Sequence, residues 1–143
     1  MNLIRSLGAG AALGAALLAT IACGGGQTSD HASPAPNCAA VAGITAPVID
    51  KGTAPLASTG TVIVGDQYFS PTCLTGATDT VTLNLRHDGR LLHNSSVPEQ
   101  SIDIDIPAGQ TVTVKVAVAG KPVGCFCKYH RDAGQKCALL PAA

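Results

Sequence analysis

The feature of this 143-residue sequence that most constrains its fold is an alternation of apolar and polar residues with a period of two. Isoleucine alternates with aspartate over residues 102–106, and valine takes every second position over residues 112–118. Successive side chains of a β-strand point to opposite faces of its sheet, so both segments predict strands with one buried face. Turn sequences such as HDG at residues 87–89 and PAG at residues 107–109 separate the strands. We therefore predict an all-β domain, folded as an antiparallel sandwich or barrel.

The composition agrees with this fold and excludes one class of partner. The chain has two Tyr, two Phe and no Trp, so its core must be built from branched aliphatic residues, which favour strands. Nine basic and nine acidic residues give a formal net charge of zero. Binding to nucleic acid phosphates needs a positive surface, so we do not expect a nucleic-acid partner.

Residues 1–22 predict an export signal, because Arg5 precedes a long uncharged apolar stretch that ends in a small residue before Cys23. The tripeptide TIA before Cys23 also resembles a bacterial lipobox, in which a diacylglyceryl group is attached to the cysteine sulfur. We therefore expect a lipid-anchored protein of the cell envelope, in the periplasm or on the outer face of the membrane. Ordinary secretion without the lipid is the alternative. Residues 23–58 are rich in Gly, Ser, Pro, Ala and Thr and predict a flexible tether before one domain at residues 59–143.

Five cysteines follow the tether's start, and in an oxidising compartment they should be paired. Five is an odd number, so one of them needs another use, and a metal ligand is the most economical one. If Cys127 binds a metal, the other four form two disulfides in any of three connectivities. One connectivity joins Cys125 to Cys137, on the strand expected to return beside it, and leaves Cys38 to pair with Cys73. Cys125 also faces the same side of its strand as Cys127, so it is an alternative ligand.

The segment GCFCKYHRDAGQKC at residues 124–137 contains the side chains best suited to metal chemistry. Cys127 and His130 are three residues apart at the end of a strand and can turn toward one centre, where His93 would arrive from an earlier part of the fold. Two imidazoles, one thiolate and a weak axial ligand form the trigonal site that suits copper. In the alternative interpretation, Cys127 belongs to a disulfide and His130 is a surface residue.

The order of these residues resembles that of the cupredoxins, the family of plastocyanin and its relatives, over residues 61–140. The resemblance rests on Phe69-x-Pro71, His93-Asn94, IPAGQTVTV at residues 106–114, and Cys127-x-x-His130-x-x-x-x-Gln135. It implies a Greek-key β-sandwich that holds one type 1 copper ion, with His93 from a strand and Cys127, His130 and Gln135 from one loop. It also implies that the backbone amide of Asn94 donates a hydrogen bond to the copper-bound sulfur.

The sequence departs from the family at the axial position, where most members have Met and this chain has Gln135. Stellacyanin-type cupredoxins also have Gln there. An amide oxygen is a harder donor than a thioether, so we predict a lower reduction potential than that of a Met-ligated relative. The remaining histidines, His31 in the tether and His87 in a polar turn, are expected to be solvated.

No general base, nucleophile or second metal cluster is evident in the sequence, so we do not expect an enzyme. The resemblance implies a one-electron carrier that exchanges electrons with a donor protein and an acceptor protein through the exposed edge of His130. Lys128, Arg131 and Lys136 outnumber Asp132 around this edge and predict a basic rim that docks an acidic partner. Two alternatives stay open: a copper carrier, chaperone or buffer that uses the same site, and a metal-free binding module.

Overall fold

The computed structural model describes residues 38–143, so the expected export signal, Cys23, His31 and the first part of the expected tether lie outside it. Within the described residues, short strands follow a single helical turn. The elements are α1 (Cys38–Val41), β1 (Thr53–Pro55), β2 (Thr59–Gly65), β3 (Tyr68–Ser70), β4 (Cys73–Ala77), β5 (Thr80–His87), β6 (His93–Val97), the 3₁₀ helix η1 (Pro98–Gln100), β7 (Ile102–Ile106), β8 (Thr111–Ala117), β9 (Val123–Phe126) and β10 (Lys136–Pro141). None of the helices in this part of the chain is long and apolar enough to cross a membrane.

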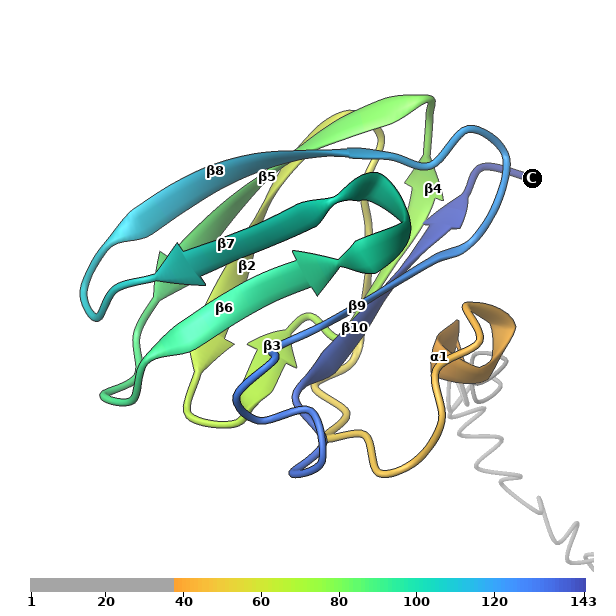
Figure 1. The fold of residues 1–143 in the computed structure, drawn as a ribbon. Helices are drawn as coiled ribbons and strands as arrows, with labels where there is room; N and C mark the ends of the chain where they lie inside the picture. Colours follow the sequence, from red (N-terminus) through yellow and green to blue (C-terminus); the bar gives the residue numbers. More distant parts are fainter. Residues whose placement is uncertain (1–37) are drawn as a thin grey trace, which may run out of the picture. The chain divides into compact units, whose positions relative to one another are not determined.

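The strands form two sheets (Figure 1). Buried side chains of both sheets belong to one hydrophobic core. The order is β1-β4-β10-β9-β6-β7 in the six-stranded sheet and β3-β2-β5-β8 in the four-stranded sheet. This arrangement confirms the predicted all-β sandwich. The sheets are mixed rather than purely antiparallel, because β1 and β10 run parallel to β4, and β2 runs parallel to β5.

The alternating residues of the predicted strands line the core. Val81, Leu83 and Leu85 of β5 are buried, and Val114 and Val116 of β8 are buried in the same cluster. The two strands pair in antiparallel register with Leu83 opposite Val114, so apolar side chains meet across the strands on the inner face. Burying each such side chain contributes about 1.5–3 kcal/mol to folding, which favours this register over one shifted by a residue.

Residues 38–58 belong to the folded domain, which corrects the predicted domain boundary at residue 59. The disulfide Cys38–Cys73 ties α1 to β4, β1 pairs with β4, and Leu56 is buried in the core. The sequence predicts a tether because this segment is rich in Gly, Ser, Pro, Ala and Thr and shows little periodicity. The disulfide and the pairing of β1 with β4 nevertheless order this segment. Both restrict the conformations open to the segment, so less apolar burial is needed to offset the entropy that it loses on folding.

A second disulfide, Cys125–Cys137, joins β9 to β10 at positions that face each other in the antiparallel register. Together with Cys38–Cys73, it gives one of the three connectivities that the sequence allows. Cys127 is the one cysteine of residues 38–143 outside a disulfide, and it is buried.

Candidate metal centre

Three of the predicted ligands come from the loop between β9 and β10. Cys127 follows the end of β9, and Gln135 directly precedes β10. The Cys127 N–H donates to the Gln135 carbonyl at 3.0 Å, and the His130 N–H donates to the Cys127 carbonyl at 3.1 Å. The Gln135 N–H in turn donates to the His130 carbonyl at 3.1 Å. These bonds fold the loop back on itself and bring its first and last ligand positions side by side.

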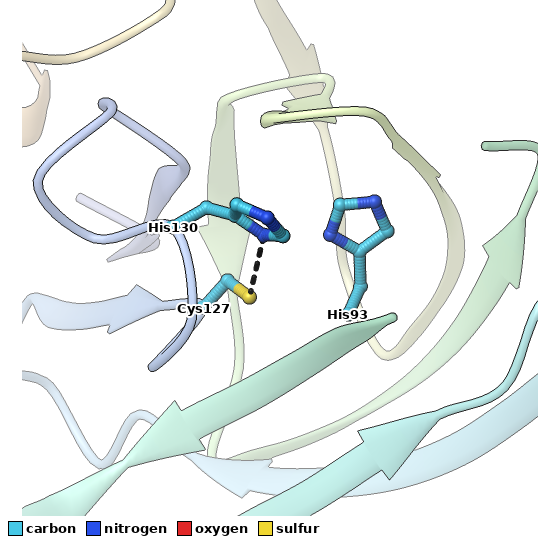
Figure 2. A group of neighbouring side chains, drawn as sticks. All are labelled: His93, Cys127 and His130. Carbon is cyan, nitrogen blue, oxygen red and sulfur yellow. Dashed lines mark hydrogen bonds between the residues drawn. The ribbon is translucent and has the colours of Figure 1, made fainter. Parts of the chain in front are cut away.

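His93, the fourth predicted ligand, begins β6 and reaches the same place from a strand that neighbours β9. Figure 2 shows the imidazoles of His93 and His130 beside each other, next to the sulfur of Cys127. That sulfur lies 3.6 Å from His130 Nδ1, and the two ring centroids are 4.9 Å apart. Donor atoms of the three residues all lie within 4.8 Å of one another. His93 and Cys127 are fully buried, and His130 is half-buried.

The side-chain amide of Gln135 has its orientation fixed by two carbonyl groups. Its Nε2 donates to the carbonyl oxygens of Gly65 and Tyr68, both at 3.2 Å. Only the nitrogen end of an amide can donate, so Oε1 must point the other way, toward His93 Nδ1 at 2.8 Å. The structure therefore brings an amide oxygen to the His93 imidazole, which itself lies beside His130 and Cys127.

His93 faces an oxygen acceptor at each of its ring nitrogens. Nδ1 lies 2.8 Å from Gln135 Oε1, and Nε2 lies 3.3 Å from Asp66 Oδ1. A neutral imidazole has a single N–H, so one of its nitrogens must direct a lone pair at an oxygen. Burial lowers the pKa of His93, which disfavours the imidazolium form that donates to both oxygens.

A cation at His93 Nδ1 would remove this conflict, because Nδ1 and Gln135 Oε1 would both bind it while Nε2–H donates to Asp66. One thiolate, two imidazoles and one amide oxygen are a donor set that suits copper. In a trigonal arrangement with metal–ligand bonds of about 2.0 and 2.3 Å, a nitrogen and a sulfur donor lie about 3.7 Å apart. The 3.6 Å between Cys127 Sγ and His130 Nδ1 is close to this separation. The residues present therefore fit a copper ion.

Asn94 holds the ligand loop against β7 through its side chain. Its Nδ2 donates to Asp103 at 2.6 Å and to Asp105 at 3.2 Å, and its Oδ1 accepts the Lys128 N–H at 3.4 Å. Lys128 Nζ donates to Asp103 at 2.8 Å, and Tyr129 Oη donates to Asp105 at 3.0 Å. The Lys128 ammonium lowers the pKa of both carboxyl groups below their usual value of 3.8. These contacts involve the side chain of Asn94, and the hydrogen bond from its backbone amide to the sulfur stays a prediction.

The structure places His87 beside the centre, so the prediction that His87 is solvated is wrong. The side chain is 2% exposed, and its ring centroid lies 4.8 Å from that of His93. Its Nδ1 is 3.0 Å from the Ile106 carbonyl oxygen, and its Nε2 is the one buried side-chain polar atom of residues 38–143 without a hydrogen-bond partner. With Asp66 and His93, His87 also forms a second group of neighbouring donor atoms. The alternating pattern of β5 could have predicted this burial, because His87 is the next inward position after Leu85.

Asp66 is another neighbour that sequence analysis missed. It lies in the turn between β2 and β3 and accepts the N–H groups of Arg90 at 2.8 Å and Leu91 at 3.1 Å. The hydrogen bonds from Leu91 and Arg90 lower the pKa of Asp66 from 3.8 to about 2. No motif or spacing in the sequence marks an aspartate in a turn as a neighbour of His93.

The predicted basic rim is wrong for Lys136. This residue is 6% exposed, and its Nζ donates to the Thr45 carbonyl at 2.7 Å. Lys128 is exposed, but its charge is matched by ion pairs with the two carboxylates of β7. Arg131 is exposed and stacks over the Phe126 ring at 4.3 Å. Of the three cations predicted for the rim, Arg131 alone is both exposed and without an ion-pair partner among residues 38–143.

Comparison with known proteins supports the fold. No protein-family model matches the sequence, and no curated protein sequence matches it. Dithionite-reduced auracyanin from the photosynthetic bacterium Roseiflexus castenholzii aligns with a TM-score of 0.50 and 12% identity, over 61% of this chain and 98% of auracyanin. The azurin Az-iso2 from Methylomonas sp. strain J aligns with a TM-score of 0.49 and 16% identity, over 62% of this chain and 100% of azurin. The chain therefore has a cupredoxin-like fold, as the sequence resemblance implied.

Proposed function

We propose that this protein binds one copper ion through His93, Cys127, His130 and Gln135 and carries single electrons. The observation that carries this proposal is the place of the thiol, because Cys127 is buried beside two imidazoles. The domain has two disulfides, and Cys127 belongs to neither of them. An unpaired thiol in such a domain needs a function, and binding a metal is such a function. Copper bound here would supply a centre that changes by one electron between its two oxidation states, with no covalent bond made or broken.

The surrounding residues support this function by keeping the donor atoms in place. Backbone hydrogen bonds within residues 127–135 and the Cys125–Cys137 disulfide brace the ligand loop. A rigid set of donors needs little rearrangement when an electron arrives, which favours fast transfer. The full burial of His93 and Gln135 excludes water, and the half-buried His130 offers an edge through which an electron can pass.

We also propose that the protein works in the cell envelope and exchanges electrons with redox proteins. Two disulfides within residues 38–143 need an oxidising compartment, which supports export. A diacylglyceryl group on Cys23 would hold the domain at the membrane surface. The exposed charge of Arg131, next to His130, favours a partner with an acidic surface at this edge.

The test is the visible absorption spectrum of the purified protein after addition of copper(II). We expect an intense blue band from charge transfer between the thiolate and copper, at one copper per protein. Cys127→Ser should abolish the band, because a hydroxyl cannot replace the thiolate. Tyr129→Phe is the matched control, since it changes the same loop but removes only a hydroxyl that contacts Asp105, and it should keep the band.

A colourless wild-type protein with one free thiol would overturn the copper proposal and favour the metal-free module. A blue protein that readily loses its copper to a chelator would favour copper delivery or storage over electron transfer.

A further inference from the structure

The carboxylate of Asp66 reaches His93 from the side of the ring opposite Gln135. Its Oδ1 lies 3.3 Å from His93 Nε2 and accepts the backbone N–H groups of Arg90 and Leu91. These two backbone groups belong to the loop that leads into β6 and His93. One carboxylate therefore holds both the ring and the chain segment that carries it.

The close approach of Asp66 depends on the glycine at position 89. A Cβ atom at Gly89 would collide with the carboxylate and the backbone nitrogen of Asp66. The Asp66 side chain is 44% exposed, whereas His93 is fully buried. The carboxylate thus stays partly hydrated, which favours its charged form, while it contacts a ring that water does not reach.

We propose that Asp66 is a positioning residue for the copper ion: it holds the proton of His93 on Nε2, leaves Nδ1 free for the metal and lowers the reduction potential. This inference rests on the proposed copper function. Metal-binding histidines commonly donate their second N–H to a carboxylate, which raises the basicity of the ligand nitrogen. A negative charge one imidazole away also stabilises copper(II) more than copper(I), because the attraction grows with the charge of the ion.

Gln135 makes this role of Asp66 necessary. In the copper-free protein, Gln135 Oε1 competes for the single His93 proton, and it would place that proton on Nδ1, the nitrogen that must bind the metal. A hydrogen bond to a charged carboxylate is roughly twice as strong as one to a neutral amide oxygen. Asp66 therefore keeps the proton on Nε2.

Nitrogen-15 NMR of the copper-free protein tests the position of the proton without any metal. We expect the His93 proton on Nε2 in the wild type and on Nδ1 in Asp66→Ala. A wild-type proton on Nδ1, or the same tautomer in both proteins, would overturn the inference.

Voltammetry of the copper protein tests the effect of the charge with Asp66→Asn and a matched control, Asp88→Asn. Asparagine keeps an oxygen for the Arg90 and Leu91 amides, so the loop is preserved while the charge is lost. Asp88 has nearly the same exposure, 45%, and pairs with Arg86 rather than with a histidine. For Asp66→Asn we expect the ratio of copper(II) to copper(I) binding constants to fall about tenfold, which raises a one-electron potential by about 59 mV. Asp88→Asn should give a much smaller rise.

Equal potentials in the two variants would overturn the role of Asp66 and leave the proposed function intact if both proteins are blue. A wild type without a blue band would instead overturn the proposed function and this inference with it. Denaturant unfolding of both variants controls for loss of structure, since a potential shift in a fully folded variant reports on the centre itself.

Discussion

At the scale of single residues, Gln135 uses both ends of its amide, and this determines what a substitution does. In Gln135→Met we expect a higher reduction potential, because a thioether is a softer axial donor than an amide oxygen. We also expect the free energy of unfolding to fall by about 1–3 kcal/mol, because the carbonyls of Gly65 and Tyr68 lose their donor. Voltammetry and denaturant unfolding measure the two effects.

Gln110→Met is the matched control for this substitution, because Gln110 is an exposed glutamine just before β8. It should leave the potential and the stability near their wild-type values. An unchanged or lower potential in Gln135→Met would mean that Gln135 is not the axial ligand, whatever happens to the stability.

The residues of the centre that have a chemical signature in the sequence could be predicted, and those without one could not. The odd number of cysteines and the Cys-x-x-His spacing indicate Cys127 and His130 as ligands. His87 has a usable signal, its place in the alternation of β5, but the adjacent turn residues suggest solvent instead. Asp66 has no signal in the sequence that marks it as a neighbour of His93. The two residues are 27 positions apart, and only the folded chain brings them into contact.

At the scale of elements, strand β7 anchors the ligand loop through the carboxylates of Asp103 and Asp105, whose pKa values the Lys128 ammonium lowers. A carboxyl group with a lowered folded-state pKa contributes stability above its unfolded pKa and loses that contribution as the pH falls through the folded value. We therefore expect the free energy of unfolding of the copper-free protein to decrease as the pH falls below 3.8. Denaturant unfolding at a series of acidic pH values measures this decrease.

The Asp103→Asn/Asp105→Asn double variant should show a shallower decrease, since it keeps oxygen acceptors for Asn94 but has no carboxyl group to protonate there. Asp132→Asn removes an exposed carboxylate of the loop and should follow the wild type. Identical pH profiles for the wild type and the double variant would show that these carboxylates do not stabilise the fold.

The strands themselves could be predicted, but not all of their neighbours. Alternating side chains give the same pattern in parallel and antiparallel sheets, so the parallel pairing of β2 with β5 could not be read from the sequence. The pairing of β1 with β4 was hidden for another reason. Strand β1 has only three residues, too few to show a period, and its place depends on the chain segments around it.

At the scale of the whole molecule, residues 38–58 are attached to the sandwich by one disulfide and by hydrogen bonds. The Ile49 N–H donates to the carbonyl of Gly134 at 2.9 Å. Gly134 is the residue that precedes the proposed ligand Gln135. The disulfide Cys38–Cys73 spans 35 residues, and closing such a loop in the unfolded chain stabilises a fold by about 4 kcal/mol. We expect Cys38→Ser/Cys73→Ser to lose stability of this order in denaturant unfolding.

Ala40→Ser is a control for this variant, because Ala40 is exposed on the same helical turn. Its stability should stay within about 0.5 kcal/mol of the wild type. A loss equally small in the double variant would contradict the view that the bridge constrains the unfolded chain.

The ligand loop is closed at both ends, and this limits how the protein can vary. The Cys125–Cys137 bridge lies two residues before Cys127 and two residues after Gln135, so three of the four proposed ligands sit inside one covalent ring. Surface loops normally tolerate added or lost residues because their flanking strands can adjust. Here the disulfide prevents β10 from shifting along β9. An inserted or deleted loop residue would therefore change the spacing of the ligands themselves. Chains that keep this site should therefore differ in the identity of the residues between the ligands but not in their number.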